Sequence, residues 1–204
     1  VTEMEEAIGA ESRFVGGRRV TDDKSLEALK MVLGGKLNLE IAARLRRYGV
    51  KSMGISGISG GTITANKRPP AKVSGSDEVV DFGHVGDIEK IDTTTLKMLL
   101  DNNYLPVLCP ISCDNDGNIL NVNADVVACR LAADLQAEKL LLLTDRLGVM
   151  TDVNDPTTLI SELSAGQARE AIRQGVIQDG MIPKVEEALR SLEHGVDQVH
   201  FLSA

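Results

Sequence analysis

The chain has 204 residues, of which 43% are hydrophobic and only 2% aromatic, so a sizeable core is possible but must be aliphatic. A net charge of −8, with Lys and Arg scattered along the chain, argues against nucleic acid as a partner. No apolar run approaches about 18 residues, which argues against a membrane span, and three cysteines without a metal-binding pattern suggest reduced thiols in a cytoplasmic protein.

Both ends of the sequence have the character of positions inside a longer domain. Residues 1–8 show a helical pattern that begins without a cap, and Gly9 is a suitable stop for that helix. Residues 199–204 finish where a predicted strand ends. We therefore expect the sequence to be part of a longer domain.

One long helix is predicted in the first part of the chain. Leucine and isoleucine recur there at helical spacing, with Thr21 or Asp22 as the N-terminal cap and Gly49 as the stop. The Gly34-Gly35 pair should weaken or bend this helix, or allow close packing against another helix in the same chain or in an oligomer. The only basic run, from Arg44 to Arg47, fits the solvated end of the helix.

A glycine-rich loop and a hairpin excursion follow. Residues 54–61 contain four glycines and two serines, whose N–H groups could cradle an anion. An ordinary turn is the simpler interpretation, and no Gly-Lys-Ser/Thr follows to make a P-loop. Residues 62–87 alternate short strands with turns, which predicts an antiparallel β-hairpin excursion. The lone His84 fits a structural or surface role better than that of a base.

Strands and helices alternate through the rest of the chain, which implies a mostly parallel sheet covered on both faces. The strand over 139–144 has four consecutive leucines and is predicted to be fully buried. Ser164 and Gln167 form a capping box. The sequence thus predicts an α/β fold, a three-layer α/β/α sandwich with a mostly parallel central sheet. The predicted elements are a helix at 93–102, strands at 105–111 and 119–122, a helix at 124–135, the strand at 139–144, helices at 165–174 and 183–193, and a strand at 199–202.

Short polar residues crowd the point where one predicted strand gives way to a helix. Asn121, Asn123 and Asp125 lie there, in the position where ligands bind in open α/β sheets. Backbone N–H groups are unpaired at such a helix start, and the helix dipole favours anions. The simpler interpretation is that Asn123 caps the helix and Asp125 complements its dipole.

Lys184 lies at the start of the last predicted helix, where the dipole disfavours a cation. A surface lysine is the ordinary interpretation, but the preceding glycine turn and the dipole conflict favour a function, because a cation beside open N–H groups suits a polyphosphate. No nucleophile–base pair or zinc motif is evident, and phosphoryl transfer needs only cations, N–H groups and positioning. The polar residues at or beside element ends are Arg19, Asn121, Asn123, Asp125, Asp145 and Lys184.

A series of short motifs extends over nearly the whole chain. They are Phe14-Val15 through Gly17, Arg19-Val20-Thr21-Asp22, Met31-Val32-Leu33 with Gly35-Lys36 and Asn38, Gly54-Ile55-Ser56-Gly57, Val85-Gly86, Asn121-Val122-Asn123-Ala124-Asp125, Leu143-Thr144-Asp145 with Gly148-Val149, and Asp179-Gly180-Met181-Ile182-Pro183-Lys184-Val185. These motifs, and their order along the chain, resemble those of the acetylglutamate kinases of the amino acid kinase family. No single motif is diagnostic, but the set is.

The resemblance implies ATP-dependent phosphorylation of the side-chain carboxylate of N-acetyl-L-glutamate, in arginine biosynthesis. By motif, Arg19, Asn121 and Asn123 would hold acetylglutamate. Lys184 would stabilise the transferring phosphoryl group, and Asp125 would orient catalytic lysines. Mg²⁺ would accompany ATP and be held mainly by its phosphates. The residues that would line the nucleotide site are Asp145, Arg146, Leu147, Gly148, Val149, Met150, Ile177, Gln178 and Gly180.

The resemblance also implies an organisation for the chain. Residues 1–204 would be a single amino acid kinase-like domain, with 1–110 binding the acyl amino acid and 111–204 the nucleotide, in a homo-oligomer that is a dimer or a hexamer. The family's first strand with a catalytic lysine and its glycine-rich phosphate loop have no match here. Because one preorganised charge is worth about 10²–10³ in rate, residues 1–204 alone are expected to have little or no activity.

The chemistry agrees with this resemblance, and the sequence leaves alternatives open. A carboxylate with a reference pKa of about 4.3 is ionised at neutral pH, so its phosphorylation needs no general base. Arg19 can grip a second carboxylate in bidentate fashion. A related kinase acting on another carboxylate or on a nucleotide is one alternative, and a binding or regulatory module that has lost catalysis is another. A purely structural module is a third.

Overall fold

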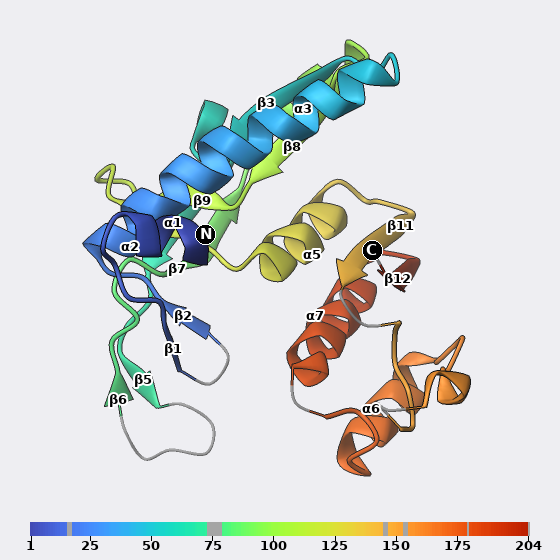
Figure 1. The fold of residues 1–204 in the computed structure, drawn as a ribbon. Helices are drawn as coiled ribbons and strands as arrows, with labels where there is room; N and C mark the ends of the chain where they lie inside the picture. Colours follow the sequence, from blue (N-terminus) through green and yellow to red (C-terminus); the bar gives the residue numbers. More distant parts are fainter. Residues whose placement is uncertain (16–17, 73–78, 145–146, 153–154, 179, 204) are drawn as a thin grey trace. The chain divides into compact units, whose positions relative to one another are not determined.

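The computed structural model describes the chain apart from residues 16–17, 73–78, 145–146, 153–154, 179 and 204 (Figure 1). The chain forms two compact units, residues 1–124 and residues 125–204. The predicted division of binding roles between residues 1–110 and 111–204 stays a prediction.

A short helix and a β-hairpin open the first unit. Gly9 follows the helix with φ +70° and so stops it as predicted. In the hairpin, Arg19 lies directly opposite Phe14. Of the two predicted caps, Asp22 is the one that acts, because its Oδ1 accepts the N–H of Ser25 at 2.8 Å. The elements here are α1 (Thr2–Ala7), β1 (Arg13–Val15), β2 (Arg18–Val20) and α2 (Asp23–Leu29).

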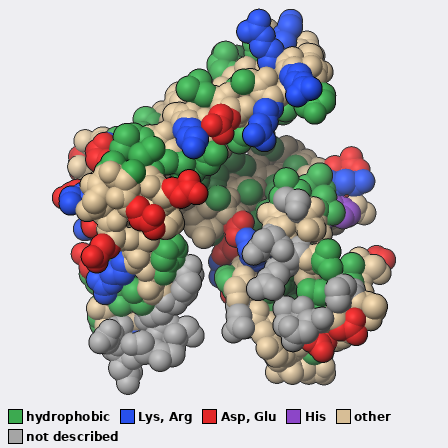
Figure 2. All heavy atoms as spheres, viewed as in Figure 1, with side chains coloured by type: hydrophobic (Ala, Val, Ile, Leu, Met, Phe, Trp, Pro, Cys, Tyr) green, Lys and Arg blue, Asp and Glu red, His purple; other side chains and the backbone are tan. Residues whose placement is uncertain are grey.

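Three helical segments run head to tail where the sequence predicts one long helix. The Gly34-Gly35 pair lies in the middle one, which is π-helical, so the regular α-helix is interrupted where the glycines were expected to weaken it. A Cβ built on either glycine meets no described atom within 4 Å, so the predicted close packing is not seen among the described residues. Exposed arginines end the run, as expected for a solvated helix end (Figure 2). The segments after α2 are η1 (Lys30–Leu37) and α3 (Asn38–Arg47).

Asn38 ties this helical run to a parallel pair of strands. Its Nδ2 donates to the carbonyl of Ile55 at 3.3 Å and to that of Val107 at 3.0 Å. A Cβ on Gly54 would lie 1.8 Å from the Asn38 side-chain oxygen, so the close approach requires glycine. The two strands are β3 (Ser52–Ser56) and β8 (Leu105–Cys109).

The hairpin excursion predicted over 62–87 is confirmed, since β4 pairs antiparallel with β7 and β5 pairs antiparallel with β6. A four-stranded sheet has the order β10-β9-β4-β7, and its β9–β10 hairpin turns at Gly117, whose φ is +85°. The remaining elements of the first unit are η2 (Ser59–Gly61), β4 (Ile63–Lys67), β5 (Ala71–Lys72), β6 (Val79–Val80), β7 (Gly86–Ile91), α4 (Thr94–Asp101), β9 (Ile111–Cys113) and β10 (Ile119–Asn121).

The second unit is built on a parallel pair of strands, β11 and β12. The prediction that β11 is fully buried is wrong. Leu140 and Leu142 pack with residues of α5, but Leu141 and Leu143 are 56% and 67% exposed, because the described helices of this unit leave that face open. Its elements are α5 (Ala124–Asp134), β11 (Lys139–Thr144), η3 (Pro156–Thr158), α6 (Ala165–Arg173), α7 (Met181–Glu193) and β12 (Gln198–Ser203).

The last helix begins two residues earlier than predicted. Gly180 is its N-cap, which places Pro183 within the first turn. Proline is tolerated there because the first backbone N–H groups of a helix have no partner inside it. Ser164 and Gln167 form the predicted capping box at α6.

The fold class is confirmed as α/β, with parallel pairs of strands and helices packed on them. The described strands are hydrogen-bonded in five separate sheets, the largest of four strands. Within the described residues, no helix is both long and apolar enough to cross a membrane.

Candidate functional site

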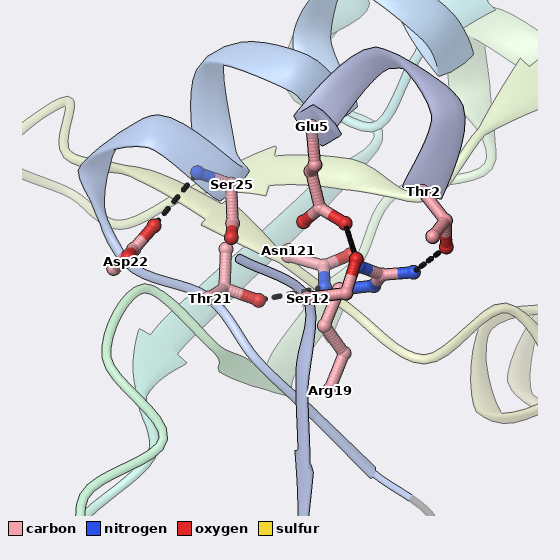
Figure 3. A network of polar contacts seen from close by, with 8 residues as sticks. All are labelled: Thr2, Glu5, Ser12, Arg19, Thr21, Asp22, Ser25 and Asn121. Carbon is pink, nitrogen blue, oxygen red and sulfur yellow. Dashed lines mark hydrogen bonds and ion pairs between the residues drawn. The ribbon is translucent and has the colours of Figure 1, made fainter. Parts of the chain in front are cut away.

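Arg19 lies at the centre of a polar network in the first unit (Figure 3). Its Nη1 donates to the Glu5 carboxylate and, at 3.2 Å, to the Ser12 hydroxyl, and its Nη2 donates to the Thr2 hydroxyl at 3.2 Å. The guanidinium also stacks over the Phe14 ring, 4.5 Å from its centroid. The hairpin makes this possible because it places Arg19 opposite Phe14 and returns it toward α1.

Thr21 connects this network to Asn121, which is far away in the sequence. The Asn121 Nδ2 donates to the Thr21 hydroxyl at 3.1 Å. Backbone bonds fix the same place, because the N–H of His84 donates to the Thr21 carbonyl at 2.7 Å and the N–H of Asn121 donates to the His84 carbonyl at 2.8 Å. The structure therefore bonds Asn121 to Thr21, two positions after Arg19 in the chain, so two of the predicted acetylglutamate residues, Arg19 and Asn121, belong to one polar network (Figure 3).

Gly83 shapes the segment that leads into His84, whose carbonyl accepts the Asn121 N–H. Its φ is +70°, and a Cβ there would lie 2.2 Å from the carbonyl oxygen of Thr21. The predicted structural role of His84 agrees with its contacts, since its Nε2 also lies 2.7 Å from Asp23 Oδ1 at the start of α2. The third predicted substrate residue, Asn123, is exposed and lies two residues after the end of β10.

Three N–H groups of the glycine-rich loop at 54–61 are already hydrogen-bonded within the fold. The N–H of Ser56 donates to Ser59 Oγ at 3.0 Å, and that of Gly57 donates to the Cys109 carbonyl at 3.3 Å. The N–H of Gly61 donates to the Ile58 carbonyl at 3.0 Å. These bonds favour the ordinary turn over the anion cradle.

In the second unit, Lys184 and Asp125 form an ion pair, with Nζ donating to Oδ2 at 2.7 Å. The two side chains are 29% and 31% exposed, so both are accessible. Asp125 lies in the first turn of α5 and Lys184 in the first turn of α7. The carboxylate offsets the unfavourable position of the lysine in the α7 dipole.

Some of the predicted nucleotide-binding residues are buried and others are exposed. Val149 and Ile177 are buried in one hydrophobic cluster, so only their backbone can face a ligand. Gly148 has φ +146° and lies against Leu159, whereas Leu147 is exposed. Met150 pairs with Leu159 through an isolated bridge, Gln178 Nε2 donates to the Gly175 carbonyl at 2.6 Å, and Gly180 caps α7. Asp145 and Arg146 lie outside the described residues.

The two buried cysteines, Cys109 and Cys129, are poorly suited to act as nucleophiles. Burial raises the pKa of the Cys109 thiol, and burial also raises that of Cys129, despite a hydrogen bond with Ser191. Both therefore stay as neutral thiols, the inert state of a buried cysteine. All three cysteines are free, as the sequence predicts.

Glu5, Ser12, Thr2 and Thr21 belong to the network but are not predicted as site residues. Glu5 is an acidic residue in a helix rich in acidic residues, so nothing local marks it as buried. Its partner Arg19 lies 14 positions further on, across a hairpin. Only the antiparallel pairing of β1 with β2 could have pointed to this contact.

Comparison with known proteins identifies the family of this chain. A family model described as the amino acid kinase family matches residues 1–203. The acetylglutamate kinase of Methanococcus aeolicus is 42% identical over 199 residues, covering 97% of this chain and 68% of that protein. That of Methanocaldococcus jannaschii is 44% identical over 200 residues, covering 97% and 67%.

Solved structures agree on the fold. N-acetylglutamate synthase from Neisseria gonorrhoeae, complexed with coenzyme A and N-acetyl-glutamate, matches with a TM-score of 0.78 and 28% identity, over 97% of this chain and 43% of that one. The Streptococcus mutans protein smu.665 matches with a TM-score of 0.82 and 25% identity, over 100% and 80%. The chain belongs to the amino acid kinase family. Within that family, the curated relatives described above are acetylglutamate kinases.

Proposed function

We propose that this protein uses ATP to phosphorylate the side-chain carboxylate of N-acetyl-L-glutamate, a step of arginine biosynthesis. The observation that carries the proposal is the 42–44% identity to acetylglutamate kinases along 97% of the chain. The polar residues that the sequence singles out lie within that matched length, and their contacts fit the chemistry.

Arg19 and Asn121 bind the acetylglutamate. A guanidinium recognises a carboxylate through paired N–H donors, and an amide side chain offers both a donor and an acceptor to an acetamido group. Asn121 is oriented for this by its bond to Thr21. Asn123, exposed beyond the same strand, supplies a further amide.

Lys184 stabilises negative charge on the transferring phosphoryl group, and Asp125 orients it. An ammonium group aimed at equatorial phosphoryl oxygens lowers the barrier because it is preorganised for the charge of the transition state. The 2.7 Å bond to Asp125 fixes the lysine, and partial exposure leaves its remaining N–H donors accessible. No general base is required, since the acceptor carboxylate is already ionised at neutral pH.

The nucleotide is bound near the start of α7, where a lysine and backbone N–H groups suit its phosphates. The predicted nucleotide residues from Asp145 to Met150, with Ile177, Gln178 and Gly180, line that site. Mg²⁺, when bound with ATP, neutralises phosphate charge. Among the described residues, no group of three or more His, Cys, Asp or Glu side chains could hold a metal ion.

The test is an acyl-phosphate assay on the complete natural protein. Hydroxylamine traps an acyl phosphate as a hydroxamate, so ATP with N-acetyl-L-glutamate should give hydroxamate, and L-glutamate or N-acetyl-L-aspartate much less. A different preferred carboxylate would identify another kinase of the family. Binding of acetylglutamate without hydroxamate or ADP would identify a binding module.

The assembly and location of the protein stay predictions. We propose a homo-oligomer, a dimer or a hexamer, in the cytoplasm. Light scattering of the purified protein distinguishes either assembly from a monomer.

A further inference from the structure

Glu5 is a charged side chain with no exposed surface at all. Its relative exposure is 0%, and it is the only Asp, Glu, Lys or Arg classed as buried among the described residues. A carboxylate is rarely buried in this way unless it is paired, because removal from water disfavours its charged form. The burial of Glu5 therefore requires a partner that compensates for the lost hydration of its charge.

The two oxygens of Glu5 are in different situations. Oε2 accepts hydrogen bonds from both the Arg19 guanidinium and the Ser12 hydroxyl (Figure 3). Oε1 has no hydrogen-bond partner among the described residues. Burial opposes ionisation of this carboxyl, but the Ser12 and Ser25 hydroxyls and the Arg19 guanidinium together hold its pKa below the ordinary value. Glu5 is therefore ionised at neutral pH and faces Arg19 as a charge.

The donors of Arg19 show what this pairing leaves available. A guanidinium has five N–H donors. Both Nη1 donors are used, by Glu5 and Ser12, and one Nη2 donor is used by Thr2. Within the described part of the chain, Nε–H and the second Nη2–H have no partner. Two donors thus stay available, the number that a bidentate bond to a carboxylate requires.

We propose that Glu5 is a positioning residue, which fixes the Arg19 guanidinium through Nη1 so that Nε–H and the second Nη2–H bind the α-carboxylate of the substrate. This inference rests on the proposed function of Arg19. Ser12 assists by donating to the same Glu5 oxygen and accepting from the same Arg19 nitrogen. The substrate does not displace Glu5, because the buried Glu5 carboxylate would then lose the opposite charge of Arg19 and keep only hydroxyl partners, which is strongly unfavourable.

The test is Glu5→Gln in the complete protein, with steady-state kinetics for each substrate. Glutamine keeps the shape of the side chain but loses the charge that holds the guanidinium. We expect the KM for acetylglutamate to rise about tenfold, because a misplaced binding group loses affinity steeply. The KM for ATP and kcat should change less than about twofold. The matched control is Glu6→Gln, an exposed carboxylate on the same helix with no side-chain partner among the described residues.

A second pair of variants shows whether Glu5 acts through Arg19. Arg19→Lys should raise the KM for acetylglutamate by itself, and adding Glu5→Gln to it should cause little further increase, because both changes remove the same interaction. Ser12→Ala should give a smaller rise in the same KM, and it tests the proposal if Glu5→Gln does not fold. An unchanged KM in Glu5→Gln overturns the proposal, and a lowered KM would show that Glu5 competes with the substrate. If Arg19→Lys leaves the KM unchanged while the enzyme still forms acyl phosphate, the role of Arg19 itself is wrong.

Discussion

The candidate site residues of the two units differ in how they are held: those around Arg19 form a network with a buried carboxylate, whereas Lys184 forms a partly exposed ion pair. In the first unit, Arg19 contacts Glu5, Ser12, Thr2 and Phe14, and its charge is paired with a fully buried carboxylate. In the second, Lys184 pairs with Asp125, and both members of the pair are about one-third exposed. A substitution in the buried network should therefore affect both folding stability and ligand binding, whereas a substitution in the exposed pair should have little effect on folding stability.

The largest effect is expected at the exposed pair. Lys184→Met should lower kcat by about 10²–10³, because one preorganised charge is lost from the transition state. The KM for acetylglutamate and the thermal midpoint should hardly change. Lys139→Met removes an exposed lysine whose Nζ lies 4.0 Å from the Glu138 carboxylate, and this matched control should keep full activity. A kcat above one-tenth of the wild-type value in Lys184→Met would exclude a direct role.

A backbone change in the first unit should affect folding and binding together. Gly83→Ala places a Cβ 2.2 Å from the Thr21 carbonyl oxygen, at φ +70°. We expect a loss of about 2–3 kcal/mol in the free energy of unfolding and a raised KM for acetylglutamate. Gly117→Ala, at φ +85° but with open space around it, should cost only about 1 kcal/mol and leave the KM alone. Equal losses in urea unfolding of the two variants would contradict the importance of the Thr21 contact.

The helix caps of the two units should differ in pH dependence. The Ser25 backbone N–H lowers the pKa of Asp22 below its usual 3.8, so the stability from this carboxylate is present above about pH 4 and lost as the pH falls below it. Asp22→Ala should therefore cost about 1 kcal/mol near neutral pH and less in acid.

Ser164→Ala removes an uncharged cap in the second unit, so its similar cost should not depend on the ionisation of residue 164. Urea unfolding at several pH values compares the two variants. A cost that is independent of pH in Asp22→Ala would contradict the assigned ionisation.

The smallest effect is expected at a surface ion pair of the second unit. Arg169 and Glu193 are 48% and 55% exposed. Replacing both with glutamine should change the free energy of unfolding by less than about 0.5 kcal/mol, because solvent screens the pair. A loss above 1 kcal/mol in chemical denaturation would show that this pair is coupled to more of the fold than the contact indicates.

Local signals in the sequence were sufficient for much of the fold. Gly9, Gly49 and Gly175 stop helices with positive φ, and Ser164 with Gln167 caps α6 as predicted. These features depend on residues a few positions apart, whose chemistry is visible in any short window. The hairpin excursion over 62–87 was predictable for the same reason.

Features that depend on distant residues were not predictable. The pairing of Glu5 with Arg19 depends on a hairpin that returns the chain toward α1, and the bond between Asn121 and Thr21 joins residues 100 positions apart. The exposed face of β11 was missed because four consecutive leucines show no alternation, so the sequence does not tell which face helices cover. Asn121 and Lys184 were singled out by their places at element ends, and their roles stay proposals.

The most direct test of the central claim is phosphorus NMR of the complete protein with ATP, Mg²⁺ and N-acetyl-L-glutamate. The account predicts a new acyl-phosphate resonance that grows in step with ADP and disappears when hydroxylamine is added. ADP that forms only with inorganic phosphate, or no consumption of ATP at all, would contradict phosphoryl transfer to a carboxylate.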